Sequence, residues 1–114
     1  MDILEKDLLP RTSDNLYYRS AGYYVIGLAN NKLGEYVKAA NAFKNSYQAD
    51  ANFQYADYCL FAQGYCYEKL LEQGAVPASE AKSIIMIQYY QLISEFPKSC
   101  YALYAQNWLE KNSQ

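Results

Sequence analysis

The sequence of 114 residues contains no histidine. This absence removes the commonest general base, the Ser-His and Cys-His pairs of covalent catalysis, and the commonest metal ligand. The five glycines stand apart from one another, so the sequence has no glycine-rich phosphate loop. We therefore expect a protein that is not an enzyme and that holds no metal and no cofactor.

The sequence also lacks an excess of charge of one sign and any long apolar run. The formal net charge is −2, with no basic block or stripe, which argues against a nucleic-acid surface. No apolar run approaches the roughly 18 residues of a membrane span. The first ten residues, MDILEKDLLP, are acidic rather than positively charged as in a secretion signal. These features predict a cytoplasmic protein that contacts neither membrane nor nucleic acid.

Cysteine is scarce, and its spacing argues against disulfides. Cys59 and Cys66 fall on one expected helix, about 10 Å apart along its axis. That separation exceeds the limit of about 7 Å between the Cα atoms of a disulfide. Cys100 is an odd third thiol, so we expect a reduced chain. No cationic run lies near Cys59 and Cys66 to lower a thiol pKa, which favours small buried or groove-lining residues.

Tyrosine, by contrast, is abundant, with 14 copies in a chain that is 52 % hydrophobic. Its ring can be buried while its hydroxyl stays in water or hydrogen-bonded, which suits helix pairs that are half core and half binding surface. The length predicts a single domain spanning residues 1–114.

One stretch, residues 23–43, predicts a helix hairpin. Gly34 interrupts its helical periodicity and fits a helix C-terminus, where a left-handed conformation is wanted. Gly27 and Ala39 are small enough to let two antiparallel helices approach closely. The larger residues expected to fill the seam around them are Tyr23, Ile26, Tyr36 and Phe43.

This spacing resembles the tetratricopeptide repeat, whose pattern begins with a large aromatic residue, a Leu-Gly pair and a Tyr, followed by Ala-x3-Phe. The pattern returns as Tyr58-x2-Phe61-Ala62-x2-Tyr65, with Tyr58 following Tyr23 by 35 residues. Its second half returns as Ile85-x3-Tyr89-x2-Leu92-x4-Pro97. The first unit departs from the family pattern at Asn30, Ser46 and Ala51.

The resemblance implies an all-α fold, a right-handed solenoid of antiparallel helix hairpins with about two and a half repeats. Residues 15–50 form repeat 1, and residues 51–97 form repeat 2, in which the first helix runs to about Gln73 and the second from near Ser79 to Phe96. Residues 98–114 form a C-terminal capping helix. The stretch from Glu95 to Leu109 is similar to the repeat subtype of bacterial cell-envelope tetratricopeptide proteins.

The N-terminal segment, residues 1–14, is expected to contain a short amphipathic helix over residues 2–9 that Pro10 ends. A helix this short is marginal in water by itself. It either docks on the first hairpin, moves freely, or is the remainder of something longer upstream.

In a hairpin stack the first helix of each repeat lines the concave side, and residues flanking the seam point into it. The predicted partner-binding groove comprises Tyr24, Leu28, Asn31 and Lys32 from repeat 1, and Cys59, Gln63, Cys66 and Tyr67 from repeat 2. Alternatively, Tyr24 and Leu28 pack against the N-terminal segment or a neighbouring helix. Glu68 and Glu72 lie four apart, and we interpret them as a solvated helix face rather than as a pair of catalytic carboxylates.

Members of this family commonly hold other proteins, so the resemblance predicts an adaptor that binds a helical or extended protein segment in an apolar, tyrosine-lined groove. The first alternative is a structural domain that self-associates into a homo-oligomer or joins a larger bacterial assembly. The second is a regulatory domain of an enzyme located elsewhere.

Overall fold

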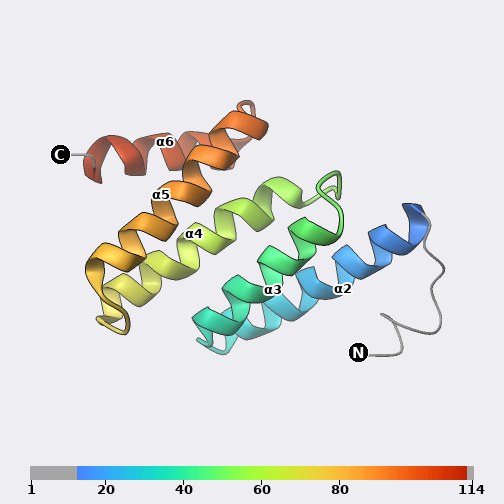
Figure 1. Cartoon of the computed structure of the whole chain (residues 1–114), viewed down its shortest axis with the longest axis horizontal. Helices are drawn as coiled ribbons and strands as arrows, with labels where there is room; N and C mark the ends of the chain where they lie inside the picture. The colour runs from blue at the N-terminus through green and yellow to red at the C-terminus, as the bar shows by residue number, and fades with distance from the viewer. Residues whose placement is uncertain (1–12, 113–114) are drawn as a thin grey trace.

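We describe a computed structural model of the chain, covering residues 13–112, in which every element is an α-helix. The all-α prediction is therefore confirmed for the described residues, while the predicted helix at residues 2–9 lies outside them. The helices are α2 (Ser13–Lys32), α3 (Tyr36–Ala49), α4 (Ala56–Gln73), α5 (Ala78–Glu95) and α6 (Cys100–Asn112). Each helix packs antiparallel against the next one along the chain, and α6 also contacts α4 (Figure 1). Within this range no helix is long and apolar enough to cross a membrane.

The helix boundaries predicted near Gln73, Ser79 and Phe96 agree with the structure to within one residue. The prediction that the helix containing Cys59 and Cys66 is extended to Gln73 is confirmed, and α5 begins one residue before the expected Ser79. The two helices of the second hairpin have 18 residues each, whereas α2 and α3 of the first have 20 and 14.

Both hairpin turns are built on a glycine in the left-handed conformation, with φ of 79° at Gly34 and 66° at Gly74. In each turn, the N–H groups of the glycine and of the next residue bond to carbonyls in the last helical turn. Their lengths are 3.1 and 2.9 Å at Gly34, and 3.1 and 3.0 Å at Gly74. This is the Schellman arrangement, which satisfies carbonyls that a helix end leaves unpaired. The predicted role of Gly34 is thus confirmed.

A glycine in the first helix of each hairpin meets an aromatic ring from the second. A Cβ atom on Gly27 would lie 2.7 Å from the Phe43 ring, and one on Gly64 would lie 2.4 Å from the Tyr89 ring. Both rings are fully buried. The close approach predicted at Gly27 is therefore present, and Gly64 provides its counterpart in the second hairpin.

The buried apolar side chains form two clusters, one on each side of α4. The first joins α3 to α4 through Ala39, Ala40, Phe43, Cys59, Ala62 and Cys66. The second joins α4, α5 and α6 through Leu60, Ile85, Tyr89, Leu92, Ala102, Ala105 and Leu109. Tyr47 and Tyr67 pack against both clusters, so they connect the hairpins.

Between α2 and α3 the buried contact is polar. The Ser20 hydroxyl donates to the Ser46 carbonyl at 2.6 Å, and the Ser46 hydroxyl donates to the Ser20 carbonyl at 2.7 Å. Both serines are fully buried. Because each hydroxyl satisfies the partner's backbone, the pair avoids the cost of an unpaired buried polar group. This explains how the first hairpin accommodates Ser46 where the repeat family usually has Ala.

Candidate interaction surface

A continuous set of aromatic contacts crosses α2, the α3–α4 connection, α4 and α6. Neighbouring ring centres lie between 4.8 and 6.4 Å apart, within the range of favourable aromatic pairs. We call this set the aromatic row. Its members are Tyr17, Tyr24, Phe53, Tyr55, Tyr58, Phe61, Tyr65, Tyr101 and Tyr104.

The spacing within each helix explains why these rings fall on one side. Tyr17 and Tyr24 are seven residues apart on α2, and Tyr58, Phe61 and Tyr65 follow a spacing of three and four on α4. Residues separated by three, four or seven positions share one face of a helix. Tyr101 and Tyr104 on α6 follow the same rule. The row therefore occupies a single face of each of these helices.

Phe53 connects the rings of α2 with those of α4. It lies in the connection between α3 and α4, is buried, and contacts Tyr17, Tyr24 and Tyr55 at ring distances of 5.5 to 5.7 Å. The turn is held locally, because the Asp50 carboxylate accepts a 2.9 Å hydrogen bond from the Asn52 N–H. The Asp50 carbonyl accepts one from the Phe53 N–H at 3.0 Å.

The tyrosines of the row differ in their burial. Burial raises the pKa of Tyr58 to about 12, with neighbouring Tyr24 and Tyr101 adding to the effect. Burial also raises the pKa of Tyr24 and of Tyr101. Three rings remain substantially exposed, namely those of Tyr17, Tyr55 and Tyr104. The row thus combines apolar ring area with hydrogen-bonding hydroxyls.

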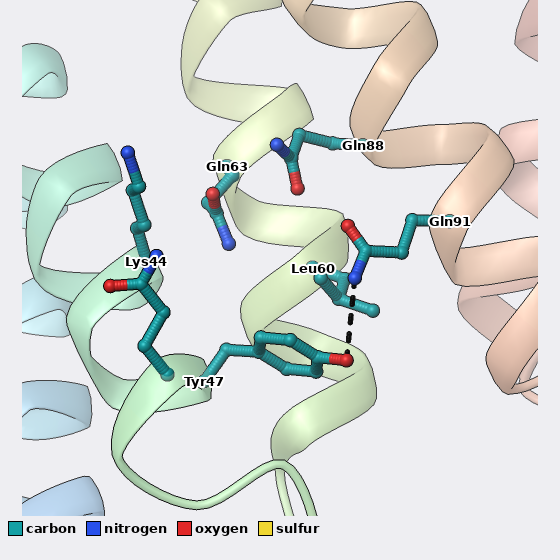
Figure 2. Close-up of a pocket in the computed structure, with 7 residues that line it drawn as sticks. Lys44, Tyr47, Leu60, Gln63, Gln88 and Gln91 are labelled. Carbon is teal, nitrogen blue, oxygen red and sulfur yellow. Dashed lines mark hydrogen bonds between the residues drawn. The ribbon is translucent and has the colours of Figure 1, made fainter.

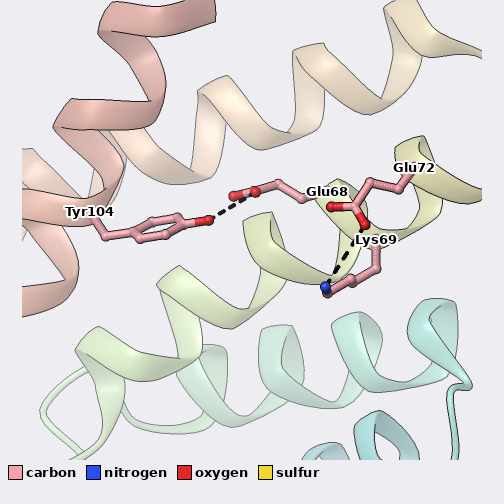
Figure 3. A network of polar contacts seen from close by, with 4 residues as sticks. All are labelled: Glu68, Lys69, Glu72 and Tyr104. Carbon is pink, nitrogen blue, oxygen red and sulfur yellow. Dashed lines mark hydrogen bonds and ion pairs between the residues drawn. The ribbon is translucent and has the colours of Figure 1, made fainter.

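A buried carboxylate lies beside the row. Glu68 on α4 is 9 % exposed and accepts a hydrogen bond from the Tyr89 hydroxyl on α5. It accepts a second one from the Tyr104 hydroxyl on α6 at 3.0 Å (Figure 3). Burial raises the pKa of the Glu68 carboxyl, and the two tyrosine hydrogen bonds partly offset that rise. The interpretation of Glu68 as part of a solvated face is therefore wrong. Glu72 is exposed, as that interpretation requires.

Next to Glu68, an ammonium group already lies against the row. The Lys69 Nζ atom is 5.1 Å from the centre of the Tyr65 ring, a cation–π distance. The same atom is 3.9 Å from a carboxylate oxygen of Glu72, in an exposed pair (Figure 3). Such an exposed pair contributes little stability in water, but its position shows that a cation is accommodated at this ring.

Of the predicted groove residues of α2, Tyr24 lies in the row. Tyr24 contacts Phe43, Tyr55 and Tyr58, so it packs against neighbouring elements as the alternative interpretation proposed. The other three are Leu28, which is 37 % exposed, Asn31, which is partly buried, and Lys32, which is exposed at the end of the helix.

The predicted groove residues of α4 face other elements. Cys59 and Cys66 are buried against α3, with Cys66 only 1 % exposed. The Gln63 side chain is buried and donates to the Cys59 carbonyl at 3.2 Å. Tyr67 packs against both core clusters. In this conformation the two thiols are not available to a partner protein, and burial raises the pKa of Cys59 to about 11 and that of Cys66 to about 12.

The reason for this difference is the register of the second hairpin. The tyrosine pattern aligned Ala62 with Gly27, but the glycine that meets an aromatic ring is Gly64, two residues further on. A shift of two residues rotates the expected face by about 200°. Phe61 and Tyr65, which lie in the row, are consequently absent from the predicted groove. The signal that would have found them is Gly64, the one glycine inside α4.

A separate polar hollow of about 120 Å³ lies between α3, α4 and α5 (Figure 2). The Gln91 amide in this hollow is already hydrogen-bonded, because it donates to the Tyr47 hydroxyl at 3.3 Å and to the Glu95 carboxylate at 2.9 Å. The lining offers hydrogen-bonding amides and one ammonium group. Its residues are Lys44, Tyr47, Gln48, Leu60, Gln63, Gln88 and Gln91.

Among residues 13–112, no group of three or more Cys, Asp or Glu side chains is placed to hold a metal ion. No protein-family model, no curated protein and no solved structure matches the chain. The geometry of the aromatic row is therefore the main guide to function.

Proposed function

We propose that this chain is a tetratricopeptide-like helical-repeat domain that acts as a protein-interaction adaptor. In this proposal α2–α3 and α4–α5 are two repeats, and α6 is the first helix of a third that serves as a cap. The hairpins form a right-handed solenoid, and the aromatic row lines its concave side. A helical or extended segment of another protein binds along the row.

The repeat assignment is supported by the glycine–aromatic contacts. In both hairpins a helical glycine meets a buried ring of the following helix, Gly27 with Phe43 and Gly64 with Tyr89. In both, a left-handed glycine ends the first helix. Two hairpins that use the same devices in the same order are what a repeat architecture requires.

The single observation that carries the adaptor function is the partial exposure of the aromatic row. Tyr17 on α2, Tyr55 in the connection and Tyr104 on α6 all expose ring area, although they belong to one contiguous set of rings. Aromatic side chains held in place by their neighbours bind at low cost in conformational entropy and often dominate interface energetics. The row is therefore suited to an amphipathic segment.

The test is a selection of peptides from a random displayed library on the full chain, followed by titration of synthetic copies. We expect peptides with apolar residues on one face to bind. Replacing Tyr17 or Tyr104 with Ala should weaken that binding by about tenfold or more, as expected for aromatic anchors.

The matched control is Ile87→Ala. Ile87 is an exposed apolar residue of α5, a helix that contributes no member to the row. Its replacement should leave peptide affinity within about twofold of the wild type. Failure to select any peptide, or equal losses in all three variants, would contradict the adaptor function.

The alternative function, self-association, is favoured by a different observation. Tyr18 and Val25, seven residues apart on α2, are 56 % and 60 % exposed. They lie on one face of the helix, and a second copy of the chain could cover them. Only a measurement of molecular mass against concentration separates this role from that of an adaptor.

A further inference from the structure

Among the described residues, no cation lies in contact with the buried carboxylate of Glu68. Its described hydrogen-bond partners are the hydroxyls of Tyr89 and Tyr104. The nearest lysine along the chain, Lys69, forms its ion pair with Glu72 and lies over the Tyr65 ring, so its charge acts on Glu68 only at longer range. A buried carboxylate that lacks a positive partner is costly when ionised. A cation brought close to it from outside would lower that cost.

Tyr104 is hydrogen-bonded to this carboxylate and is also exposed at the surface. Its hydroxyl donates to Glu68 at 3.0 Å, while the residue remains 40 % exposed. Donation to a carboxylate shifts electron density toward the phenol ring and makes its face more attractive to a cation. The three neighbouring rings of Phe61, Tyr65 and Tyr89 meet Tyr104 at angles of 67 to 88°, so none of them stacks on its face.

The adjacent ring shows that this part of the row accommodates an ammonium group. Lys69 lies over the ring of Tyr65, 5.1 Å from its centre, and the ring centres of Tyr65 and Tyr104 are 6.4 Å apart. Lys69 makes its cation–π contact with Tyr65. No cation–π contact to Tyr104 is present among the described residues. The exposed carboxylate of Glu72 adds negative charge close by (Figure 3).

We propose that the α4–α6 end of the aromatic row recognises a basic side chain, Lys or Arg, of the bound protein segment, with the Tyr104 ring as the cation receptor and Glu68 as the charge behind it. This inference rests on the adaptor function proposed above and adds the chemistry of the partner. The partner is then an amphipathic segment with apolar residues along the row and one cationic residue at Tyr104. The side chain is recognised by its charge, because the ring presents no hydrogen-bond pattern of its own.

The test uses peptides selected from the random library on the full chain. Each bound peptide is synthesised in two forms, one native and one in which arginine is replaced by citrulline and lysine by acetyl-lysine. These replacements keep the length and polarity of the side chain but remove its charge. We expect selected peptides to carry Lys or Arg, and the neutral copies to bind the wild-type chain about tenfold or more weakly.

Protein variants locate the effect. The affinities of the Tyr104→Leu variant for the charged and neutral peptides should differ by less than about threefold. For Ile87→Ala, the two affinities should differ as much as they do for the wild type. Because the charge is removed on the peptide, the wild-type comparison stands even where a variant folds poorly. Peptides that bind equally well in both forms would overturn this inference and leave the adaptor function intact. A selection that yields no binding peptide would overturn both.

Discussion

Tyr89 and Tyr104 donate to the same carboxylate, yet one is fully buried and the other is 40 % exposed. Burial and the hydrogen bond to Glu68 raise the pKa of both hydroxyls above the ordinary range, so both remain donors at any physiological pH. The pair shows how tyrosine serves two purposes in this chain. Tyr89 fills the contact with Gly64, and Tyr104 carries the same hydrogen-bonding chemistry to the surface.

The contact between Gly64 and Tyr89 gives a stability prediction. A Cβ on Gly64 would lie 2.4 Å from a ring that is fully buried and held by its hydroxyl, so the ring has little room to move. Gly64→Ala should therefore lower the free energy of unfolding by about 1–3 kcal/mol, despite the higher helix propensity of alanine. Chemical denaturation measures this. The control is Asn107→Ala on the exposed face of α6, which should leave the free energy of unfolding within about 0.5 kcal/mol of the wild-type value. If Gly64→Ala has as small an effect as this control, α4 and α5 are not in close contact at Gly64.

A second prediction concerns pH and Glu68. Burial raises the pKa of Glu68 above its ordinary value of 4.5, so the folded chain binds the proton more tightly than the unfolded chain. The stability due to the protonated form is fully present below that ordinary value and is lost as pH rises through the raised pKa. Glu68→Gln, which stays neutral, lacks this loss. Its free energy of unfolding should improve relative to wild type as pH increases from about 4 to about 7.

The measurement is a series of denaturation curves for both proteins across that pH range. The hydroxyls of Tyr89 and Tyr104 and the charges of Lys69 and Glu72 face or neighbour Glu68, and the substitution leaves all of them in place. A difference between the two proteins that stays constant with pH would mean that Glu68 titrates normally in the folded state.

At the scale of single helices, local signals in the sequence predict the boundaries well. Gly34 and Gly74 end their helices because they adopt the left-handed conformation that a Schellman turn requires, and Pro97 follows the end of α5. The rotation of a helix about its axis is less well determined. In α4, tyrosines, cysteines and alanines occur on several faces, so a tyrosine pattern alone aligned Tyr58 with Tyr23 and missed the register that Gly64 sets.

The sequence predicts one part of the candidate site and not another. The tyrosine-rich character of the surface and its member Tyr24 on α2 follow from the sequence, because the repeat-like spacing of residues 23–43 places Tyr24 beside the seam of the first hairpin. The burial of Glu68 does not follow from it. Its partners Tyr89 and Tyr104 come from two later helices, and only the packing of α5 and α6 on α4 brings them together.

The prediction at this scale concerns α6. This helix contributes Ala102, Ala105 and Leu109 to the second core cluster. Removing residues 100–114 should uncover Tyr89 and Leu92 and lower the free energy of unfolding by roughly 3 kcal/mol or more, or cause aggregation. Thermal unfolding followed by circular dichroism measures the change.

A matched pair of substitutions tests the same point in the full chain. Ala105→Glu places a carboxylate in the fully buried contact of α6 with α5, whereas Gln106→Glu places it on the exposed side of the same helix. The first should destabilise strongly and the second should have little effect. A shortened chain as stable as the parent, or equal effects of the two glutamates, would show that α6 does not belong to the packed domain.

At the scale of the whole molecule, the first and the last of the described helices, α2 and α6, both expose apolar side chains. The outer side of α6 carries the exposed polar residues Gln106, Asn107 and Glu110 together with Leu103, which is 61 % exposed. The exposed side of α2 carries Tyr18 and Val25. Two large apolar side chains are exposed on this side of α2 and one on the outer side of α6, so α2 is the better candidate for contact with a second copy.

The last prediction decides between the adaptor and self-association from molecular mass. If the adaptor function is correct, light scattering should give the mass of a monomer, 13.1 kDa, with no increase as the concentration rises. The range of about 10 to 500 µM is suitable, because mass action would reveal a dimer of moderate affinity within it. If the exposed side of α2 pairs with a second copy, the mass should rise toward that of a dimer. In that case Val25→Glu should restore the monomer, whereas Gln106→Glu on α6 should not, because only the first change places charge on the paired face. A dimer that survives Val25→Glu would place the contact on another surface, and a dimer whose formation also blocks peptide binding would place it on the aromatic row.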